Sequence, residues 1–292
     1  MKKVKVGITI GDPAGIGTII TSLAIKQLSG LAEFIVIGKK TNKVELGKIR
    51  SLHGRLSIEY LDKALDFIKS RKIDCLVTCP ISKEAINMAG YKYSGHTEYF
   101  ANRTNSDSTV MMLLNKRIRF SLVTRHIPLN MVSKTLSKEL IYNNIMTTAS
   151  SLKRMFDIKK LRFVVCGINP HASDNGLIGF EENKKIKPVI VKLKKSISII
   201  NGPISADIAI AGALNKQYDC VIAMYHDQAL IPLKVTGLNT GVNITLGLPF
   251  VRTSPLHGTA FDLINKPALI KPDSLVAAIK LAVKCTLTQR KA

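Results

Sequence analysis

Short runs of apolar and β-branched residues recur along the chain, and each run ends abruptly in a polar cluster. KVKVGITI leads into GDPAGIG, IDCLVTC into PISKE, RFSLVT into RHIPLN, LRFVVCG into INPHASDNG, and YDCVIAM into YHDQ. Continuous apolar runs of this length are typical of strands buried on both faces of a parallel sheet. Amphipathic segments such as YLDKALDFIKS and DSLVAAIKLAVKC alternate with them. The pattern predicts an α/β fold with a largely parallel sheet.

Length and hydropathy narrow the class further. With 292 residues, 46% of them hydrophobic, the chain can bury the core of one large α/β domain or two ordinary ones. The apolar N-terminal stretch is too short for a signal sequence, and no run approaches the roughly 18 apolar residues of a membrane span. We therefore expect a soluble, cytoplasmic protein with no membrane partner.

The charge balance is strongly basic, since 43 Lys and Arg against 20 Asp and Glu give a net charge of +23. This surplus raises the alternative of a nucleic-acid partner, because neutralising phosphates needs a basic face. The lysines are dispersed, however, and aromatic residues make up only 5% of the chain, so surfaces for base stacking are scarce. We favour an ordinary basic surface without a nucleic-acid partner, and such a surface attracts small anionic substrates.

Cysteine usage indicates a reducing environment. None of the five cysteines has a partner at CxxC spacing, which argues against a disulfide framework or a zinc site. Four of them stand in or beside apolar runs, namely Cys75, Cys79, Cys166 and Cys220. We expect reduced thiols in the core.

The histidines concentrate in the polar clusters. Four of the six stand in these clusters or in the loop SGHTEYF, namely His96, His126, His171 and His226. In open α/β sheets, ligands bind outside the carboxyl ends of the strands, where such clusters lie. We therefore expect the polar clusters to converge on one ligand site.

A catalytic metal is the first chemistry that these residues suggest. His126, His171 and His226 each follow a predicted strand, and three neutral imidazoles can hold one divalent ion with positions left open for substrate. Asp207 and Asp227 are candidates to orient the rings from behind. The alternative is that each histidine is a hydrogen-bonded residue at a strand end. Three histidines suit Zn²⁺, Co²⁺ or Mn²⁺, and Mg²⁺ less naturally.

A second group of residues suits an anionic ligand. Lys234, Asn243 and Arg252 lie in a glycine-rich, turn-dense region, and such side chains recognise phosphorylated substrates that carry a carboxylate. His96 and Thr97 of SGHTEYF offer an imidazole and a hydroxyl side by side. That loop is equally compatible with a Ser-Gly turn that starts a helix. GDPAGIG is either an anion-binding loop at a helix start or a tight strand-to-helix turn, because it matches neither GxGxxG nor a P-loop.

Longer motifs carry a family resemblance over nearly the whole chain. They are ITIGDPAGIG, PISKEAINMAG, SGHTEYFA, GINPHASDNGLIGFEE, YHDQALIPLK and GVNITLGLPFVRTSPLHGTAFD. In this order they resemble the PdxA family of 4-hydroxythreonine-4-phosphate dehydrogenases. The resemblance implies two α/β/α domains similar to isocitrate and isopropylmalate dehydrogenases and unlike a Rossmann fold. It implies one domain over 1–98 plus 250–292, another over 99–249 with metal and dimer contacts, an active site in the cleft between them, and a homodimer that shares this site.

The resemblance also implies roles for individual residues. The metal ligands would be His126, His171 and His226, which would be catalytic together with Lys234. The substrate and its phosphate would be bound by His96, Thr97, Lys234, Asn243 and Arg252. The implied reaction oxidises 4-phosphooxy-L-threonine at C3, with NAD(P) as hydride acceptor and a divalent metal acidifying the hydroxyl, and then releases CO₂ to give 3-amino-2-oxopropyl phosphate. The residues that would bind the cofactor are not assigned.

Departures from the family pattern keep alternatives open. Thr18 and Ile19 replace the usual Pro-Glu after GDPAGIG, Arg125 replaces a usual threonine, and FDLINKPALIKPD replaces a glycine-rich stretch at 261–273. These changes bear on the preference for NAD or NADP. The first alternative is a paralogue that oxidises 4-phospho-D-erythronate or D-threonate, and a remote one is a basic nucleic-acid-binding protein on the same fold.

Overall fold

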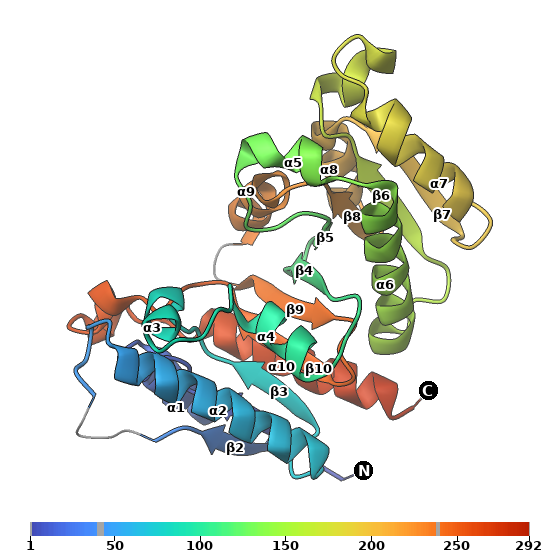
Figure 1. Ribbon diagram of the computed structural model, residues 1–292. Helices are drawn as coiled ribbons and strands as arrows, with labels where there is room; N and C mark the ends of the chain where they lie inside the picture. The colour runs from blue at the N-terminus through green and yellow to red at the C-terminus, as the bar shows by residue number, and fades with distance from the viewer. Residues whose placement is uncertain (1, 40–43, 238–239, 292) are drawn as a thin grey trace. The chain divides into compact units, whose positions relative to one another are not determined.

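The computed structural model describes residues 2–39, 44–237 and 240–291. The chain divides into two compact units, of which unit 1 comprises Met1–Asp107 and Val242–Ala292 and unit 2 comprises Ser108–Gly241 (Figure 1). The division expected from the family resemblance was 1–98 plus 250–292 and 99–249. The units in the structure place all of helix α4 (His96–Arg103) and strand β9 (Val242–Leu246) in unit 1.

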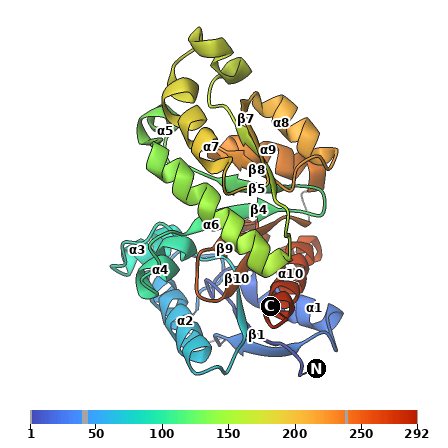
Figure 2. The ribbon, with the colours of Figure 1, turned by 90° about the vertical axis from the view of Figure 1, so that its right-hand side faces the viewer.

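Among its described residues, unit 1 has a five-stranded sheet in the order β2-β1-β3-β10-β9. The other strands are β1 (Lys5–Thr9), β2 (Glu33–Ile37), β3 (Cys75–Thr78) and β10 (Val251–Pro255). Neighbouring strands are parallel except β9 and β10. Helices α2 (Ser51–Lys69), α3 (Lys83–Met88) and α4 lie on one side of this sheet, and α1 (Gly17–Gln27) and α10 (Asp273–Gln289) on the other (Figure 2). Two short turns, η4 (Phe261–Leu263) and η5 (Pro267–Leu269), precede α10.

Unit 2 has the same plan over its described residues, with five strands in the order β4-β5-β8-β6-β7. They are β4 (Val110–Leu114), β5 (Arg119–Leu122), β6 (Arg162–Cys166), β7 (Ile199–Ile204) and β8 (Cys220–Ala223), and only the β4–β5 pair is antiparallel. The helices are α5 (Leu129–Thr135), α6 (Lys138–Phe156), α7 (Lys187–Leu193), α8 (Ala206–Leu214) and α9 (His226–Gly237), with short helical turns η1 (Pro170–Gly176) and η2 (Glu182–Ile186). The predicted α/β class with a largely parallel sheet is confirmed.

The local sequence explains these elements. Strands β3, β4 and β8 are buried at every position, as was predicted for β3 and β8 from their continuous apolar runs. Helix α6 begins where the Ser137 side chain accepts the Leu140 N–H, and it ends at Asp157 in the left-handed conformation. All five cysteines are buried and free, as predicted. Within the described ranges, no helix combines the length and the apolar character needed to cross a bilayer.

The GDPAGIG segment is a tight strand-to-helix turn. Gly11 has φ +68°, and a Cβ there would lie 2.1 Å from the Pro80 carbonyl oxygen. A Cβ at Gly17 would lie 1.9 Å from the Ile10 carbonyl oxygen. Four backbone N–H groups of the loop donate to protein acceptors, namely those of Asp12, Ala14, Gly15 and Ile16. Since these amides are already used, the structure favours the turn over the anion-binding loop.

Candidate functional site

Two of the predicted metal ligands meet at a cavity in unit 2. The cavity has a volume of about 260 Å³, and its lining includes Arg125, His126, Tyr225, His226 and Asp227. His126 follows β5 and His226 begins α9 after β8, and these two strands are parallel neighbours. Their carboxyl ends therefore bring the two imidazoles together, with ring centroids 5.7 Å apart and ring planes tilted by 49°.

His226 is oriented by the next residue in the chain. Its Nδ1 lies 2.6 Å from Oδ1 of Asp227. A carboxylate that accepts the Nδ1–H of a neutral imidazole leaves Nε2 with its lone pair, as in many metal-bound histidines. Asp227 therefore occupies the orienting position that was predicted for it.

His171 does not join this pair. It lies in η1, where residues 171–175 all have φ between +44° and +69°, the left-handed region that non-glycine residues rarely adopt in succession. Its neighbour is Asp207 on α8, whose pKa is lowered mainly by the hydrogen bond from the Ser205 hydroxyl and to a smaller extent by the charge of His171. Over the described parts of the chain, no group of three or more His, Cys, Asp or Glu side chains has metal-binding geometry.

The histidine pair nevertheless suits a divalent cation chemically. Two imidazoles, one of them oriented by a carboxylate, stand beside a cavity that has room for an ion and part of a substrate. Zn²⁺, Co²⁺ and Mn²⁺ all accept such nitrogen donors. The structure thus assembles the predicted three-histidine cluster as a pair, with the third histidine on a separate turn beside its own carboxylate.

A buried arginine forms the centre of a second group, in unit 1. Arg252 on β10 is only 1% exposed. Its guanidinium donates to Oγ1 of Thr78 from Nε and Nη2, at 3.1 and 2.5 Å, and to Oγ1 of Thr245 from Nη1 at 3.0 Å. Burial lowers the pKa of Arg252 to about 9, and the charge of Glu98 opposes that shift. The side chain is therefore still a cation near neutral pH, held in the core by neutral hydroxyl groups.

The imidazole of His96 lies beside this cation. Burial and, to a smaller extent, the charge of Arg252 lower the pKa of His96 well below its ordinary value, so the ring is neutral. It stacks on the Phe100 ring, with centroids 6.4 Å apart, and the Arg252 guanidinium lies 5.9 Å from the same ring. The buried Nε2 of His96 has no hydrogen-bond partner among the described residues.

Two further predicted residues lie in this group. The hydroxyl of Thr97 is 3.5 Å from that of Thr245 on β9. Asn243 lies two residues before Thr245 and so on the same face of β9, and its buried Oδ1 also lacks a partner among the described residues. Buried polar atoms without partners are rare in proteins, so two of them in the same unit as a buried cation mark a candidate ligand site. We call Arg252, His96, Thr97 and Asn243 the anion group.

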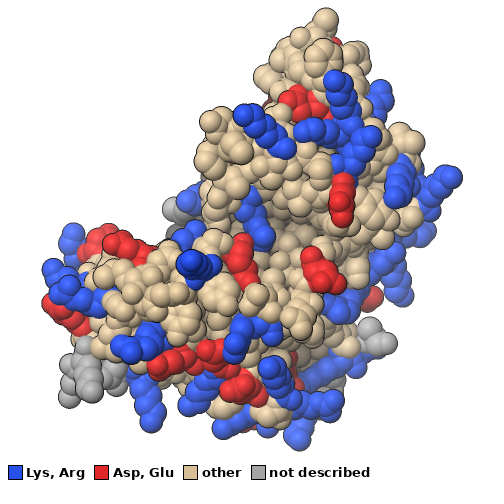
Figure 3. Space-filling view, in the orientation of Figure 1, with Lys and Arg blue, Asp and Glu red and all other residues tan. Residues whose placement is uncertain are grey.

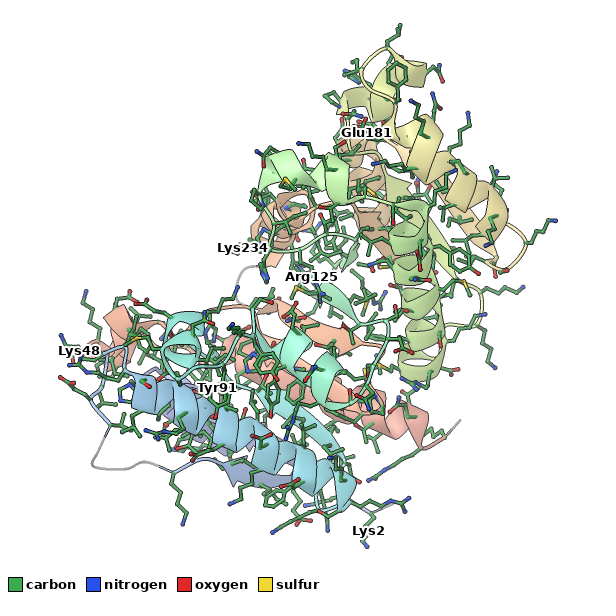
Figure 4. The ribbon with its side chains drawn as sticks, in the orientation of Figure 1. Lys2, Lys48, Tyr91, Arg125, Glu181 and Lys234 are labelled. Atoms are coloured by element: carbon green, nitrogen blue, oxygen red, sulfur yellow. The ribbon has the colours of Figure 1, made fainter. Side chains whose placement is uncertain are left out.

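Lys234 belongs to unit 2 and not to the unit that holds the anion group. It lies on α9, eight residues after His226, which is about 12 Å along the helix axis. Figure 4 labels Lys234 and also Arg125, the residue that precedes His126 and lines the histidine cavity.

Sequence reasoning missed one buried acid. Asp12 is 1% exposed, and its Oδ1 accepts the Ala14 N–H at 2.9 Å, whereas its Oδ2 has no partner among the described residues. Burial raises its pKa, and the hydrogen bond from Ala14 and the charge of His53 oppose the shift. A signal was present in the sequence, because only Gly11 separates Asp12 from the apolar run KVKVGITI.

The fold and these two groups define an α/β protein with a histidine-lined cavity after two strands of unit 2 and a buried arginine on a strand of unit 1. Residues 14–282 match the family described as pyridoxal phosphate biosynthetic protein PdxA, and the chain belongs to this family. It is 36% identical over 317 residues to a 4-hydroxythreonine-4-phosphate dehydrogenase of Sulfurihydrogenibium sp. (strain YO3AOP1), covering 96% of this chain and 98% of the relative.

The chain is also similar to a relative that is named for a different substrate and to a protein whose crystal structure is known. A D-threonate 4-phosphate dehydrogenase of Cupriavidus necator is 37% identical over 275 residues, covering 94% of this chain and 82% of the relative. The crystal structure of 4-hydroxythreonine-4-phosphate dehydrogenase from Klebsiella pneumoniae superposes with a TM-score of 0.85 at 32% identity, covering 98% of each chain. These findings confirm the family that the motifs indicated.

Proposed function

We propose that this chain is an NAD(P)- and divalent-metal-dependent 4-hydroxythreonine-4-phosphate dehydrogenase of pyridoxal phosphate biosynthesis. It oxidises 4-phosphooxy-L-threonine at C3 and releases CO₂ to form 3-amino-2-oxopropyl phosphate. Membership of the PdxA family and the names of the relatives support the reaction. The structural observation that carries the proposal is the anion group, in which a buried cation lies beside buried polar atoms that have no partner among the described residues.

The anion group binds a charged end of the substrate. Arg252 supplies a fixed positive charge, and its planar guanidinium matches phosphate or carboxylate oxygens. The neutral imidazole of His96 and the amide of Asn243 are already desolvated, so they lose little further hydration when they bind a ligand. Lys234 of unit 2 contributes a second cation for the phosphate, and Thr97 adds a hydroxyl.

His126, His171 and His226 are the residues that hold the metal, with Asp227 and Asp207 as orienting carboxylates. The bound ion, which we take to be Zn²⁺, Co²⁺, Mn²⁺ or Mg²⁺, supplies Lewis acidity at the C3 hydroxyl and at the ketone that forms from it. NAD(P), when bound, would supply the acceptor for the hydride that leaves C3. The left-handed turn that carries His171 is the part of unit 2 that must complete the ligand set.

A homodimer is part of the proposal. Unit 2 carries large apolar side chains that are exposed on α5, on α9 and between η1 and η2, namely Leu129, Met131, Leu177, Phe180, Ile231 and Val235. Apolar exposure of this kind marks surfaces that another protein covers. A second copy of the chain is the occupant we propose, and because residues of α5 and α9 line the histidine cavity, the proposed contact would lie next to that cavity.

One observation favours a second candidate function. The relative named D-threonate 4-phosphate dehydrogenase is about as similar to this chain as those named for hydroxythreonine phosphate. Its substrate has no amino group, so the two activities require the same phosphate contacts but differ at C2. By contrast, Lys and Arg in Figure 3 are scattered among acidic residues and form no single stripe, which gives a nucleic-acid role no support on that face.

Turnover on the two substrates tests the proposal. The purified chain is given NAD⁺ or NADP⁺, a divalent metal, and either 4-phosphooxy-L-threonine or D-threonate 4-phosphate, and formation of the reduced cofactor is followed by absorbance. We expect a higher kcat/KM on 4-phosphooxy-L-threonine. A higher value on the threonate would assign the chain to the second candidate, and no reduction with either substrate would contradict both.

A further inference from the structure

Unit 2 contains a buried set of polar contacts that the proposed chemistry does not use. Gln228 on α9 is 7% exposed, and both ends of its amide bind backbone groups of different strand ends. Its Oε1 accepts the Met224 N–H at 2.7 Å, just after β8, and its Nε2 donates to the Gly167 carbonyl at 2.8 Å, just after β6. One side chain thus joins the carboxyl ends of two parallel strands.

Thr124 extends this connection to a third strand end. Its hydroxyl is buried and donates to the Met224 carbonyl at 2.6 Å, directly after β5. Both backbone polar groups of Met224 are therefore bound by side chains, one from Gln228 and one from Thr124. A register shift between β5 and β8 would break the contact of Thr124 with Met224, and one between β6 and β8 would break the contact of Gln228 with Gly167.

Glu182 continues the contacts past the end of β6. The residue is 1% exposed, and its Oε1 accepts the backbone N–H groups of Ile168 and Asn169, both at 2.8 Å. Its Oε2 accepts from the Asn169 side chain at 2.9 Å. Glu181, which is labelled in Figure 4, accepts from the same amide and from the Ser133 hydroxyl, and these two hydrogen bonds lower its pKa to about 2.

These contacts lie directly before the three predicted metal-binding histidines in the sequence. Thr124 stands two residues before His126, Met224 two residues before His226, and Asn169 two residues before His171. Each histidine thus follows a backbone segment that is fixed by a buried polar side chain. Gln228 connects the segments after β6 and β8, and Thr124 connects the segments after β5 and β8, so the two side chains together join all three.

We infer that Gln228 and Thr124 are positioning residues of the metal site, which brace the three histidine-bearing strand ends at a fixed separation. The inference rests on the proposed function for its metal. The brace acts before any ion binds, because all its contacts are made within the protein. It allows the turn of His171 to approach the His126–His226 pair without moving the strands.

The test is the affinity for Co²⁺, titrated into the purified protein in competition with a chromophoric chelator and followed through the visible spectrum of the bound ion. Gln228→Met keeps the volume of the side chain but loses both hydrogen bonds. We expect it to weaken Co²⁺ binding by about 10- to 100-fold, the usual effect of losing an outer contact at a metal site, and to change the spectrum. Thr124→Val should weaken it less, and Thr124→Ser, which keeps the hydroxyl, should restore it.

A matched control separates positioning from general destabilisation. Thr148 is a buried threonine of the same unit whose hydroxyl bonds to Ser121 and to the Asn144 carbonyl, away from the strand ends. Thr148→Val should lower the melting temperature as the brace variants do, with Co²⁺ affinity unchanged. Should Gln228→Met fail to fold, the Thr124 pair carries the test.

The outcomes distinguish the inference from the proposed function. A wild-type protein that binds Co²⁺ and is active, with Gln228→Met and Thr124→Val binding it within twofold of wild type, would overturn the brace and leave the function standing. Equal weakening by Thr148→Val would also overturn it, since the effect would then be general. A wild-type protein with no affinity for any divalent metal would overturn the proposed function and the inference with it.

Discussion

The anion group of unit 1 and the histidine cavity of unit 2 are built in opposite ways. Arg252 is sealed in the core, where the hydroxyls of Thr78 and Thr245 hold it, and the half-buried ring of His96 stacks on Phe100 beside it. The histidines border a cavity, and only two of the three stand together. A permanent charge in the core needs permanent internal partners, whereas metal ligands can be left incomplete because the ion itself supplies the energy that draws them together.

The largest effect is expected at the histidine cavity of unit 2, where only two of the three predicted metal ligands stand together. His226→Ala removes one of the two assembled imidazoles, so we expect bound metal to be lost and kcat to fall by about 10³-fold or more. Metal content after dialysis and the rate with added metal measure this. The fold should survive, because the side chain borders a cavity, and an unchanged melting temperature checks that. A metal-free variant that is still active would remove His226 from the site.

The second largest effect is expected from the anion group. A substitution of Arg252 should weaken substrate binding but should not lower the stability of the fold. Arg252→Met removes the buried cation while keeping much of its volume. We expect kcat/KM to fall by about 10²- to 10³-fold, since truncating one partner of a buried charged contact costs about 2–5 kcal/mol. The melting temperature should hold or rise, because no buried charge remains to be desolvated. Metal affinity should not change, and a loss of bound metal would contradict the separation of the two groups.

A smaller effect is expected at the orienting carboxylate. Asp227→Asn keeps an oxygen for the Nδ1–H of His226 but removes the negative charge. Metal affinity should drop by about 10- to 100-fold, with Michaelis constants for substrate little changed at saturating metal. Isothermal titration with Zn²⁺ gives the affinity. Affinity equal to wild type would mean that the 2.6 Å contact does not tune the histidine.

The smallest expected effect is a pH dependence of the stability of unit 1, and it arises from His96. The pKa of His96 is lowered in the folded state, so between that value and its ordinary 6.5 the unfolded chain binds one more proton than the folded one. The contribution of His96 to the free energy of unfolding is fully present above pH 6.5. As the pH falls below 6.5, this free energy decreases by up to about 1.4 kcal/mol per pH unit. Urea unfolding on either side of that pH measures it, and His96→Gln should flatten the slope. Equal slopes of stability against pH for the wild type and for His96→Gln would mean that the imidazole of His96 is exposed to water in the folded state.

Much of this could be predicted from the sequence, because burial leaves a local signature. Apolar runs located buried strands, and the polar residues that follow two of them located His126 and His226, which meet at one cavity. GDPAGIG was ambiguous, since glycines serve both anion binding and close packing, and the backbone hydrogen bonds of the loop together with the Pro80 carbonyl against Gly11 decide between them.

What could not be predicted depends on contacts between distant segments or on unusual backbone. The left-handed turn around His171 consists of Ala, Ser, Asp and Asn as well as His, a composition with no glycine to announce it. The brace joins Gln228 to Gly167 and Glu182 to Ile168, pairings that no local periodicity encodes.

One measurement tests the central claim most directly, namely NADH formation from 4-phosphooxy-L-threonine and NAD⁺ by the purified chain before chelation, after chelation, and after a divalent metal is returned. The account predicts turnover that the chelator abolishes and that Zn²⁺, Co²⁺ or Mn²⁺ restores. Turnover that is indifferent to the chelator would contradict the metal role of the histidines. An absence of turnover with every metal and both nicotinamide cofactors would contradict the dehydrogenase itself.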